Sequence, residues 1–275
     1  MRASFILMFI SLWITSNAWA WGELGHRIIA EYGSGLVENS TLANCHVTAA
    51  QLVSHTNDPD RVWRQQRRKY RFEAEAHFFH VDRQPTDWRT RKEAKDRDQG
   101  FLVYRIADWI EEARAARKAQ DWDKLTERLY GLSHYLGDLT QPLHLHHDYD
   151  GKSVGLPDLH SQFESKMVSR FEEEIRNAVQ KRLREEKIPA LWAKTDLKTL
   201  TFDTAQQSFS KAPRMFESAR PALQAPKASK RKKTKKIAEP RFVKKLLWQH
   251  TGTLAVDQLT LAARLWGNAL NSICK

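Results

Sequence analysis

The sequence predicts an all-α protein with a single, mostly helical domain. Apolar residues recur at helical spacing in several long segments, and no run of alternating apolar and polar residues predicts strands or hairpins. The chain has 275 residues, of which 41% are hydrophobic. This length and composition suit one large domain with a buried core, and they exclude a mainly disordered protein. Ten tryptophans fit a large helical core.

The helical pattern is strongest in residues Phe101–Lys118. There Leu102, Ile106, Trp109 and Ile110 fall on one side of an amphipathic helix. Four further helical segments are predicted, at Gly25–Val37, Trp122–Leu136, Leu159–Glu186 and Val243–Ile273. The sequence shows no internal repeat, so the helices are expected to form one domain.

Two segments are predicted to be irregular. Thr56–Trp63 contains the turn signal Asn57-Asp58-Pro59-Asp60. Residues 212–240 hold four prolines around the tract KASKRKKTKK, which predicts a disordered surface insertion. The tract contributes seven of the positive charges behind the net charge of +12, so the high charge is largely local. A solvated loop is the favoured interpretation of this tract, ahead of a nucleic-acid-binding arm.

The first 20 residues have the features of a secretory signal peptide. Arg2 is the charged start, Phe5–Ile14 is the apolar stretch, and Ala18-Trp19-Ala20 fits the cleavage rule. The apolar stretch is too short to span a bilayer, and no later segment predicts a transmembrane helix. We therefore expect cleavage before Trp21 and a secreted or periplasmic mature domain over residues 21–275.

The two cysteines, Cys45 and Cys274, leave an alternative open. In an oxidising compartment they could be bonded and join the N-terminal region to the C-terminus. Two free thiols agree equally well with the sequence.

The densest cluster of chemically active residues is Ser133–Asp150 (SHYLGDLTQPLHLHHDYD). His134 and Asp138 are four residues apart, so on a helix both side chains project from one face. His144 follows two residues after the helix-ending Pro142. Histidine nitrogen and carboxylate oxygen are common zinc ligands, although one such pair by itself is weak evidence.

Other segments add ligands of the same kind. His160 and Glu164 repeat the four-residue spacing, and His77 lies beside aromatic residues. Asp58 lies upstream in a turn, where Asp60 competes with it for the same role. Together these residues exceed what one zinc ion needs, which favours a site with several metal ions.

The sequence Trp21-Gly-Glu-Leu-Gly-His26 supplies a further set of metal-binding atoms. After cleavage behind Ala20, Trp21 has a free α-amino group. That amine and the Trp21 carbonyl could chelate a metal ion, with His26 one turn further along.

Taken together, these motifs resemble the zinc-dependent superfamily that joins single-strand-specific nucleases of the S-one/P-one type with bacterial zinc phospholipases C. HYLGDLTQPLH at 134–144 resembles the superfamily signature, and Trp-Gly-x-x-Gly-His at 21–26 resembles the nuclease branch. The segment Val256–Ile273 is similar to the last helix of bacterial members. The resemblance covers most of the chain after residue 20, apart from the region around 212–240. It implies an all-α domain around a trinuclear zinc cluster.

The resemblance also implies which residues hold the three zinc ions. The first would be bound by Asp58, His77, His134 and Asp138, the second by His144, His160 and Glu164, and the third by the amine and carbonyl of Trp21 with His26 and Asp138. Asp138 would bridge two metal ions. Asp58 is preferred to Asp60 because Arg61 then follows three residues later, as in the nucleases.

The function implied is hydrolysis of phosphodiesters, and an endonuclease that cleaves single-stranded DNA and RNA to 5′-phosphorylated products is expected. Zinc lowers the pKa of a bound water to about 7. Asp58 would orient the attacking water, Asp138 would hold the paired metals, and Arg61 would stabilise charge on the phosphoryl oxygens. Phe78 would stack on a base. A monomer is expected.

Two other functions remain open. Glu164, and the 15 residues between His144 and His160, are more typical of phospholipase C, which would act on phosphatidylcholine-type lipids. The strip Arg61–Arg71, with its cations and aromatics, suits single-stranded nucleic acid or an anionic membrane. The third possibility is an exported metal-binding protein without catalysis.

His146 and His147 lie near the cluster, and one of them could replace a ligand or contact substrate.

Overall fold

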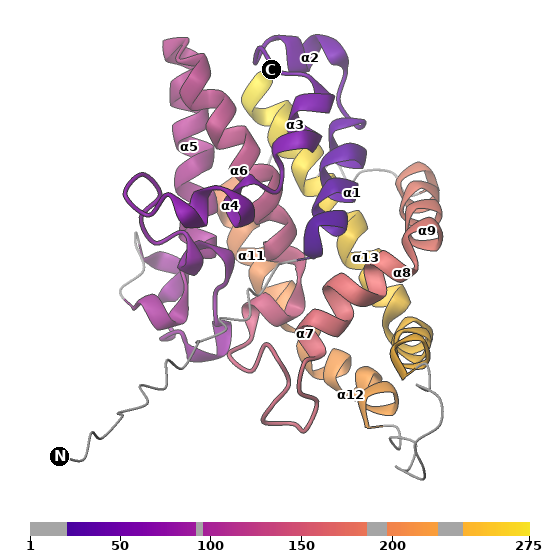
Figure 1. Cartoon of the computed structure of the whole chain (residues 1–275). Coiled ribbons are helices and arrows are strands. Elements are labelled where there is room, and N and C mark those ends of the chain that lie inside the picture. The colour runs from indigo at the N-terminus through magenta and orange to yellow at the C-terminus, as the bar shows by residue number, and fades with distance from the viewer. Residues whose placement is uncertain (1–20, 92–95, 186–196, 225–238) are drawn as a thin grey trace, which may run out of the picture.

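The computed structural model describes residues 21–91, 96–185, 197–224 and 239–275 (Figure 1). These residues form helices and connecting segments with no β-strand, which confirms the predicted all-α fold. The long helix α13 (Glu239–Cys274) runs through the molecule and contacts α1 (Gly22–Ser34), α6 (Trp122–Thr140) and α9 (Glu172–Glu185). α5 (Leu102–Ala119) packs along α6.

Shorter elements complete the described part of the chain. The remaining α-helices are α2 (Asn39–Ala43), α3 (Ala49–His55), α4 (Asp58–Arg61), α7 (Leu159–Ser161), α8 (Val168–Arg170), α11 (Leu197–Phe209) and α12 (Ala212–Leu223). Single 3₁₀ turns are η1 (Trp63–Gln65), η2 (Ala74–His77), η3 (Val81–Arg83), η4 (Trp88–Thr90), η5 (Arg97–Gln99) and η6 (Pro142–Leu145), and η7 (Gln162–Met167) is a π-helix.

The five predicted helical segments are found, with shifted ends. α1 begins earlier than predicted, and α6 continues to Thr140. The segment predicted as one helix from Leu159 is instead divided into α7, the π-helix, α8 and α9, and its last predicted residue lies outside the described residues. π-helical turns are often found at functional sites. Here the turn begins between His160 and Glu164.

The structure corrects the prediction of an irregular segment from residue 212. α12 occupies Ala212–Leu223 and packs on α13. Pro213 lies in its first turn, where proline needs no hydrogen-bond partner. Met215, Phe216 and Ala219 are buried, so burial of one face stabilises a helix that the prolines appeared to forbid. The basic tract at 227–236 lies outside the described residues.

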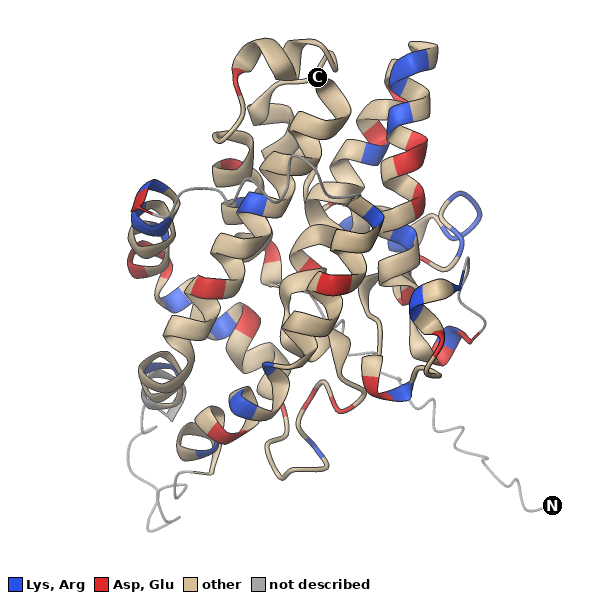
Figure 2. Ribbon diagram, turned by 180° about the vertical axis from the view of Figure 1, so that it is seen from behind, with Lys and Arg blue, Asp and Glu red and all other residues tan. Residues whose placement is uncertain are grey.

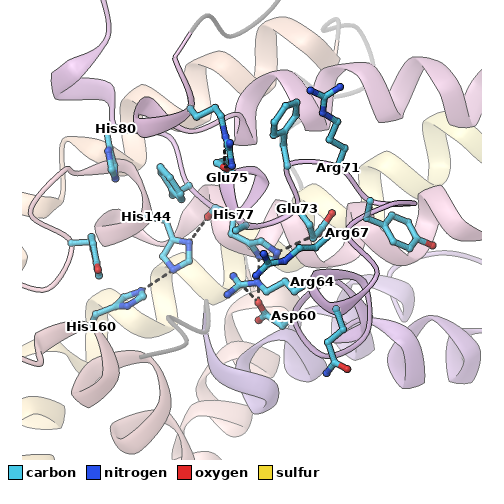
Figure 3. A pocket seen from close by; sticks show the side chains of 17 residues that line it. Asp60, Arg64, Arg67, Arg71, Glu73, Glu75, His77, His80, His144 and His160 are labelled. Atoms are coloured by element: carbon cyan, nitrogen blue, oxygen red, sulfur yellow. Dashed lines mark hydrogen bonds and ion pairs between the residues drawn. The ribbon is translucent and has the colours of Figure 1, made fainter. Parts of the chain in front are cut away.

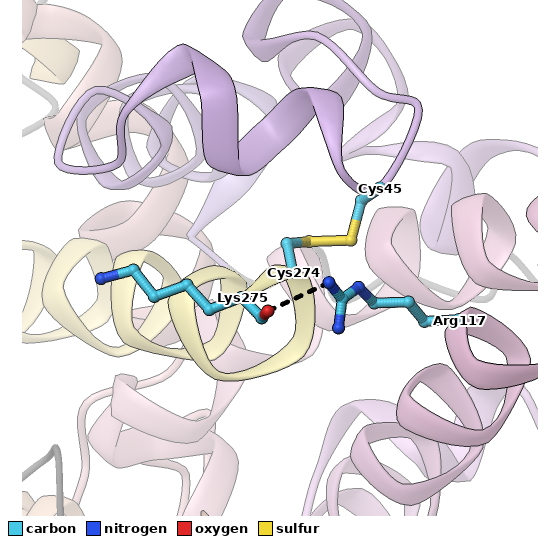
Figure 4. The surroundings of a disulfide bond; sticks show 4 residues. All are labelled: Cys45, Arg117, Cys274 and Lys275. Carbon is cyan, nitrogen blue, oxygen red and sulfur yellow. Dashed lines mark hydrogen bonds between the residues drawn. A yellow bond between two sulfur atoms is a disulfide. The ribbon is translucent and has the colours of Figure 1, made fainter.

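Cys45 and Cys274 form a disulfide bond, with their Cα atoms 5.4 Å apart (Figure 4). The bond joins the segment after α2 to the C-terminal end of α13. Beside it, Arg117 Nη2 donates a hydrogen bond to the Lys275 carbonyl at 3.1 Å. The disulfide settles the alternative that the sequence left open. Within the described residues, no helix has both the length and the apolar character needed to cross a membrane.

The N-terminal helix lies unusually close to α6. The Trp21 indole is buried and donates a hydrogen bond from Nε1 to the Gly137 carbonyl at 2.9 Å. A Cβ atom on Gly137 would lie 2.8 Å from Nδ1 of His26, so the close approach requires glycine at this position. The packing thereby brings His26 beside Asp138, the next residue of α6.

Candidate metal centre

Three groups of buried histidine and carboxylate side chains come together in the described part of the chain. In each group the ligand atoms lie within 4.8 Å of one another. The groups are His26, His134 and Asp138; Asp60, His77 and His134; and His144, His160 and Glu164. Of the predicted ligands, all except Asp58 and Trp21 belong to one of these groups.

Asp138 connects the first two groups. Its Oδ1 lies 3.3 Å from His26 Nε2, and its Oδ2 lies 3.0 Å from His77 Nδ1 and 3.6 Å from His134 Nε2. Oδ1 therefore faces His26, whereas Oδ2 faces His77 and His134. This arrangement suits a carboxylate that bridges two cations.

A backbone contact fixes the orientation of His134. Its Nδ1 lies 2.8 Å from the Thr56 carbonyl oxygen, which can only accept a hydrogen bond, so Nδ1 carries the proton. The lone pair of Nε2 then faces the centre, 3.1 Å from His77 Nδ1 and 3.6 Å from Asp60 Oδ2. Outer hydrogen bonds of this kind hold metal-binding histidines in the required tautomer.

Glu73, which the sequence interpretation missed, supports His77. Glu73 Oε1 lies 3.3 Å from His77 Nε2, on the side of the ring opposite the centre. Tyr135 donates a hydrogen bond to the same oxygen at 2.5 Å, and Arg105 Nη1 lies 3.2 Å from Oε2. The four-residue spacing between Glu73 and His77 was the available signal. The arrangement leaves His77 Nδ1 directed toward Asp138.

The third group is held in a similar way. His144 Nδ1 lies 2.5 Å from the His77 carbonyl oxygen, so it donates and leaves the Nε2 lone pair for the site. That Nε2 is 2.8 Å from His160 Nε2 (Figure 3). His160 Nε2 in turn lies 2.7 Å from Glu164 Oε2. Gln141 donates a hydrogen bond to Glu164 at 3.2 Å.

Burial determines the protonation of these ligands in the metal-free protein. Burial raises the pKa of Asp60 and of Glu164 to about 7, and it raises the pKa of Asp138 well above its usual value. Burial also lowers the pKa of His160 to about 4 and holds the pKa of His77 well below its usual value. These two histidines are thus neutral at pH 7, which is the form that binds metal ions.

The donor set fits zinc. Histidine nitrogens and carboxylate oxygens are its usual ligands, and three or four around each ion satisfy its coordination. Asp138 Oδ1 is buried and accepts no hydrogen bond from the described residues. A cation would compensate buried carboxylates that are otherwise driven to bind protons.

The choice of Asp58 over Asp60 does not agree with the structure. Asp58 pairs with His55 at 2.7 Å and its side chain is 25% exposed, whereas Asp60 is 3% exposed and lies between His77 and His134. Residues two apart on a helix point to nearly opposite sides. On the single turn of α4, only one of the two aspartates can therefore face the centre.

Arg61 is also placed away from the centre. Its side chain is 60% exposed and lies 3.6 Å from Glu23. Arg64 occupies the expected place instead, with Nη2 2.9 Å from Asp60 Oδ1. Arg64 follows Asp60 by four residues, about one helical turn, so the inward-facing Asp60 has Arg64 rather than Arg61 beside it.

Trp21 and Phe78 are placed near the centre. The Trp21 carbonyl accepts a hydrogen bond from Gly25 at 3.1 Å, and chelation through its amine remains a prediction. The Phe78 ring is partly exposed and stacks on His80, with the ring centroids 4.6 Å apart. Phe78 also lines a pocket beside these residues.

His146 and His147 do not join the three groups. They lie with Asp82 in a separate, more exposed group, in which His147 Nδ1 contacts the Asp82 carboxylate. The backbone N–H of Asp148 donates to His146 Nδ1 at 3.0 Å. In a neutral ring the proton is then on Nε2, the atom that faces Asp82.

A pocket of about 730 Å³ opens beside the second and third groups. One side is formed by ligand residues of these groups, including His77 and His144. Four arginines and three aromatic residues also line the pocket, namely Arg64, Arg67, Arg71, Arg97, Tyr70, Phe72 and Phe78. Figure 3 shows Arg64, Arg67 and Arg71 together with candidate ligands. The pocket therefore combines candidate metal-ligand residues with several arginine side chains.

The fold and site define the class of this protein: an all-α chain whose helices enclose three adjacent groups of metal-ligand residues. The sequence pattern of the S1/P1 nuclease family matches residues 21–273. The chain belongs to the S1/P1 nuclease family. It is also similar to Endonuclease 2 of Arabidopsis thaliana, with 21% identity over 194 residues, which cover 63% of this chain and 66% of that protein. The match therefore spans just under two thirds of the relative's length.

Proposed function

We propose that this chain is a zinc-dependent endonuclease that hydrolyses single-stranded DNA and RNA to 5′-phosphorylated products. The observation that carries the proposal is the pocket that candidate metal-ligand residues and four arginines line together. Membership of the S1/P1 nuclease family supports it. A phosphodiester is anionic, and both metal ions and arginines would bind it.

Three zinc ions are proposed. The first is held by Asp60, His77, His134 and Asp138, the second by His144, His160 and Glu164, and the third by Trp21, His26 and Asp138. Zinc bound there would neutralise charge on the phosphate and lower the pKa of a coordinated water to about 7. Binding through the Trp21 amine requires a chain that begins at Trp21.

The protein's own groups supply orientation. Asp60 is proposed to accept a hydrogen bond from the attacking water, because its carboxylate is buried beside His77 and His134. Arg64 is proposed to donate hydrogen bonds to the phosphoryl oxygens, which gain charge in the transition state. Phe78 offers a partly exposed ring on which an unpaired base can stack.

Export through a signal peptide at residues 1–20 is part of the proposal. The Cys45–Cys274 disulfide supports it, because such bonds persist in oxidising compartments. A secreted or periplasmic monomer is proposed. Residues 1–20 themselves lie outside the described part of the chain.

The test uses a zinc-loaded chain that begins at Trp21, mixed separately with single-stranded DNA, RNA and phosphatidylcholine vesicles. Cleavage of the polynucleotides that stops on addition of a chelator, with intact lipid, is the expected result. Release of phosphocholine without nucleic-acid cleavage would assign a phospholipase C. Three bound zinc ions without cleavage of any substrate would support a non-catalytic metal-binding protein.

A further inference from the structure

Two arginines of the pocket wall have no role in the proposed chemistry. Arg67 and Arg71 line the pocket and are exposed. Within the described residues, neither has an ion pair to a carboxylate, whereas Arg64 pairs with Asp60 and Arg97 with Glu75. Exposed cations that line a pocket and pair with no carboxylate are available to bind an anionic ligand.

Phe72 holds a conformation that keeps cations beside the pocket. Its φ of 61° lies in the left-handed region, which costs an L-residue about 1–2 kcal/mol. The ring is half buried and meets the edge of Phe101, with centroids 5.5 Å apart. The guanidinium carbons of Arg71 and Arg97 lie 4.5 and 4.9 Å from the ring centroid, so cation–π attraction holds both against one platform.

The arginines form a row that leads away from the metal centre. Arg64 lies at Asp60, Arg67 extends beside it, and Arg71 stands further out at the edge of the pocket (Figure 3). The basic residues between η1 and η2 gather on one projecting loop (Figure 2). A substrate with one phosphate would occupy only the inner end of this row.

We propose that Arg67, Arg71 and the Phe72 platform form a distal subsite that binds a second backbone phosphate of a polynucleotide whose neighbouring phosphodiester lies at the metal centre. The inference rests on the proposed nuclease function and deepens it. A polynucleotide carries one phosphate per nucleotide, so a row of cations can neutralise successive phosphates. The subsite favours chains over dinucleotides and small diesters.

The experiment compares the double variant Arg67→Gln/Arg71→Gln with Arg68→Gln, which changes an exposed cation of the same loop that does not line the pocket. Both are assayed on a 20-nucleotide single strand and on bis(p-nitrophenyl) phosphate, which has a single phosphate. The double variant is expected to raise KM for the oligonucleotide about tenfold and to leave hydrolysis of the small diester unchanged. Arg68→Gln should change both activities less than twofold.

A binding measurement separates this inference from the proposed function. Fluorescence anisotropy of a labelled single strand, with the protein in chelator, reports the subsite without turnover. The double variant should lower the magnitude of the slope of log K against log salt by about 0.7, because it removes the contact to one backbone phosphate of a single strand. Equal losses on both substrates, an unchanged salt slope, or binding to phosphatidylserine vesicles but not to the oligonucleotide would overturn the subsite. If the zinc-loaded wild type does not cleave the oligonucleotide, but the double variant still lowers the salt dependence of oligonucleotide binding, only the nuclease function would be overturned.

Discussion

Substitution of Glu73 by glutamine tests whether the environment of the centre tunes its metal affinity. Glu73 Oε1 lies 3.3 Å from His77 Nε2, and Tyr135 donates to the same oxygen at 2.5 Å. Glutamine keeps the shape of the side chain but removes the negative charge behind the imidazole. His77 then becomes a weaker electron donor toward the proposed zinc.

The expected loss is about 10- to 100-fold in zinc affinity for one site, which corresponds to about 1.4–2.7 kcal/mol. Competition with a zinc-binding dye measures it, and the stoichiometry at saturating zinc should not change. Glu75→Gln is the matched control, because Glu75 pairs with Arg97 and touches no candidate ligand in the described residues. Unchanged affinity in Glu73→Gln, or an equal loss in Glu75→Gln, would show that Glu73 does not tune the zinc affinity of the centre.

Three further perturbations follow. Gly137→Ala should destabilise the fold by about 1–3 kcal/mol, because the new Cβ would lie 2.8 Å from Nδ1 of His26. Thermal unfolding measures this loss of stability, and an unchanged Tm would contradict the prediction. Zinc binding at pH 6 should release protons from Asp60 and Glu164, whose pKa is raised to about 7 by burial. Zinc affinity should therefore increase as the pH rises from about 6 through about 7. Calorimetry in buffers of different ionisation enthalpy detects the protons, and an equal heat in all buffers would contradict the prediction. Replacing Cys45 and Cys274 by serine should lower the free energy of unfolding, measured with urea, by about 2–5 kcal/mol. A reductant should lower the free energy of unfolding of the wild type and leave that of the serine variant unchanged.

Periodicity predicted the fold well because the long helices bury one apolar face along their whole length. α5 and α6 were located within a few residues for this reason. α12 was missed because its prolines are turn signals in isolation. The apolar face of α12 stabilises the helix only when α13 covers it. Local sequence cannot supply that partner.

The candidate ligand residues were predictable to different degrees. His134 with Asp138, and His160 with Glu164, were identified because helical spacing fixes which side chains lie together. Asp60 was not preferred, because spacing cannot tell which side of a single turn faces the centre. Support from groups distant in sequence, such as the Thr56 carbonyl behind His134, likewise depends on tertiary packing.

The most direct test of the account compares Asp60→Asn with Asp58→Asn in chelator-sensitive cleavage of a single-stranded oligonucleotide. Both changes remove one carboxylate from α4, but only Asp60 is buried between His77 and His134. Asp60→Asn is expected to lower kcat by about 100-fold or more, whereas Asp58→Asn should retain most of the activity. Full activity in Asp60→Asn, or an equal loss in Asp58→Asn, would contradict the proposed centre.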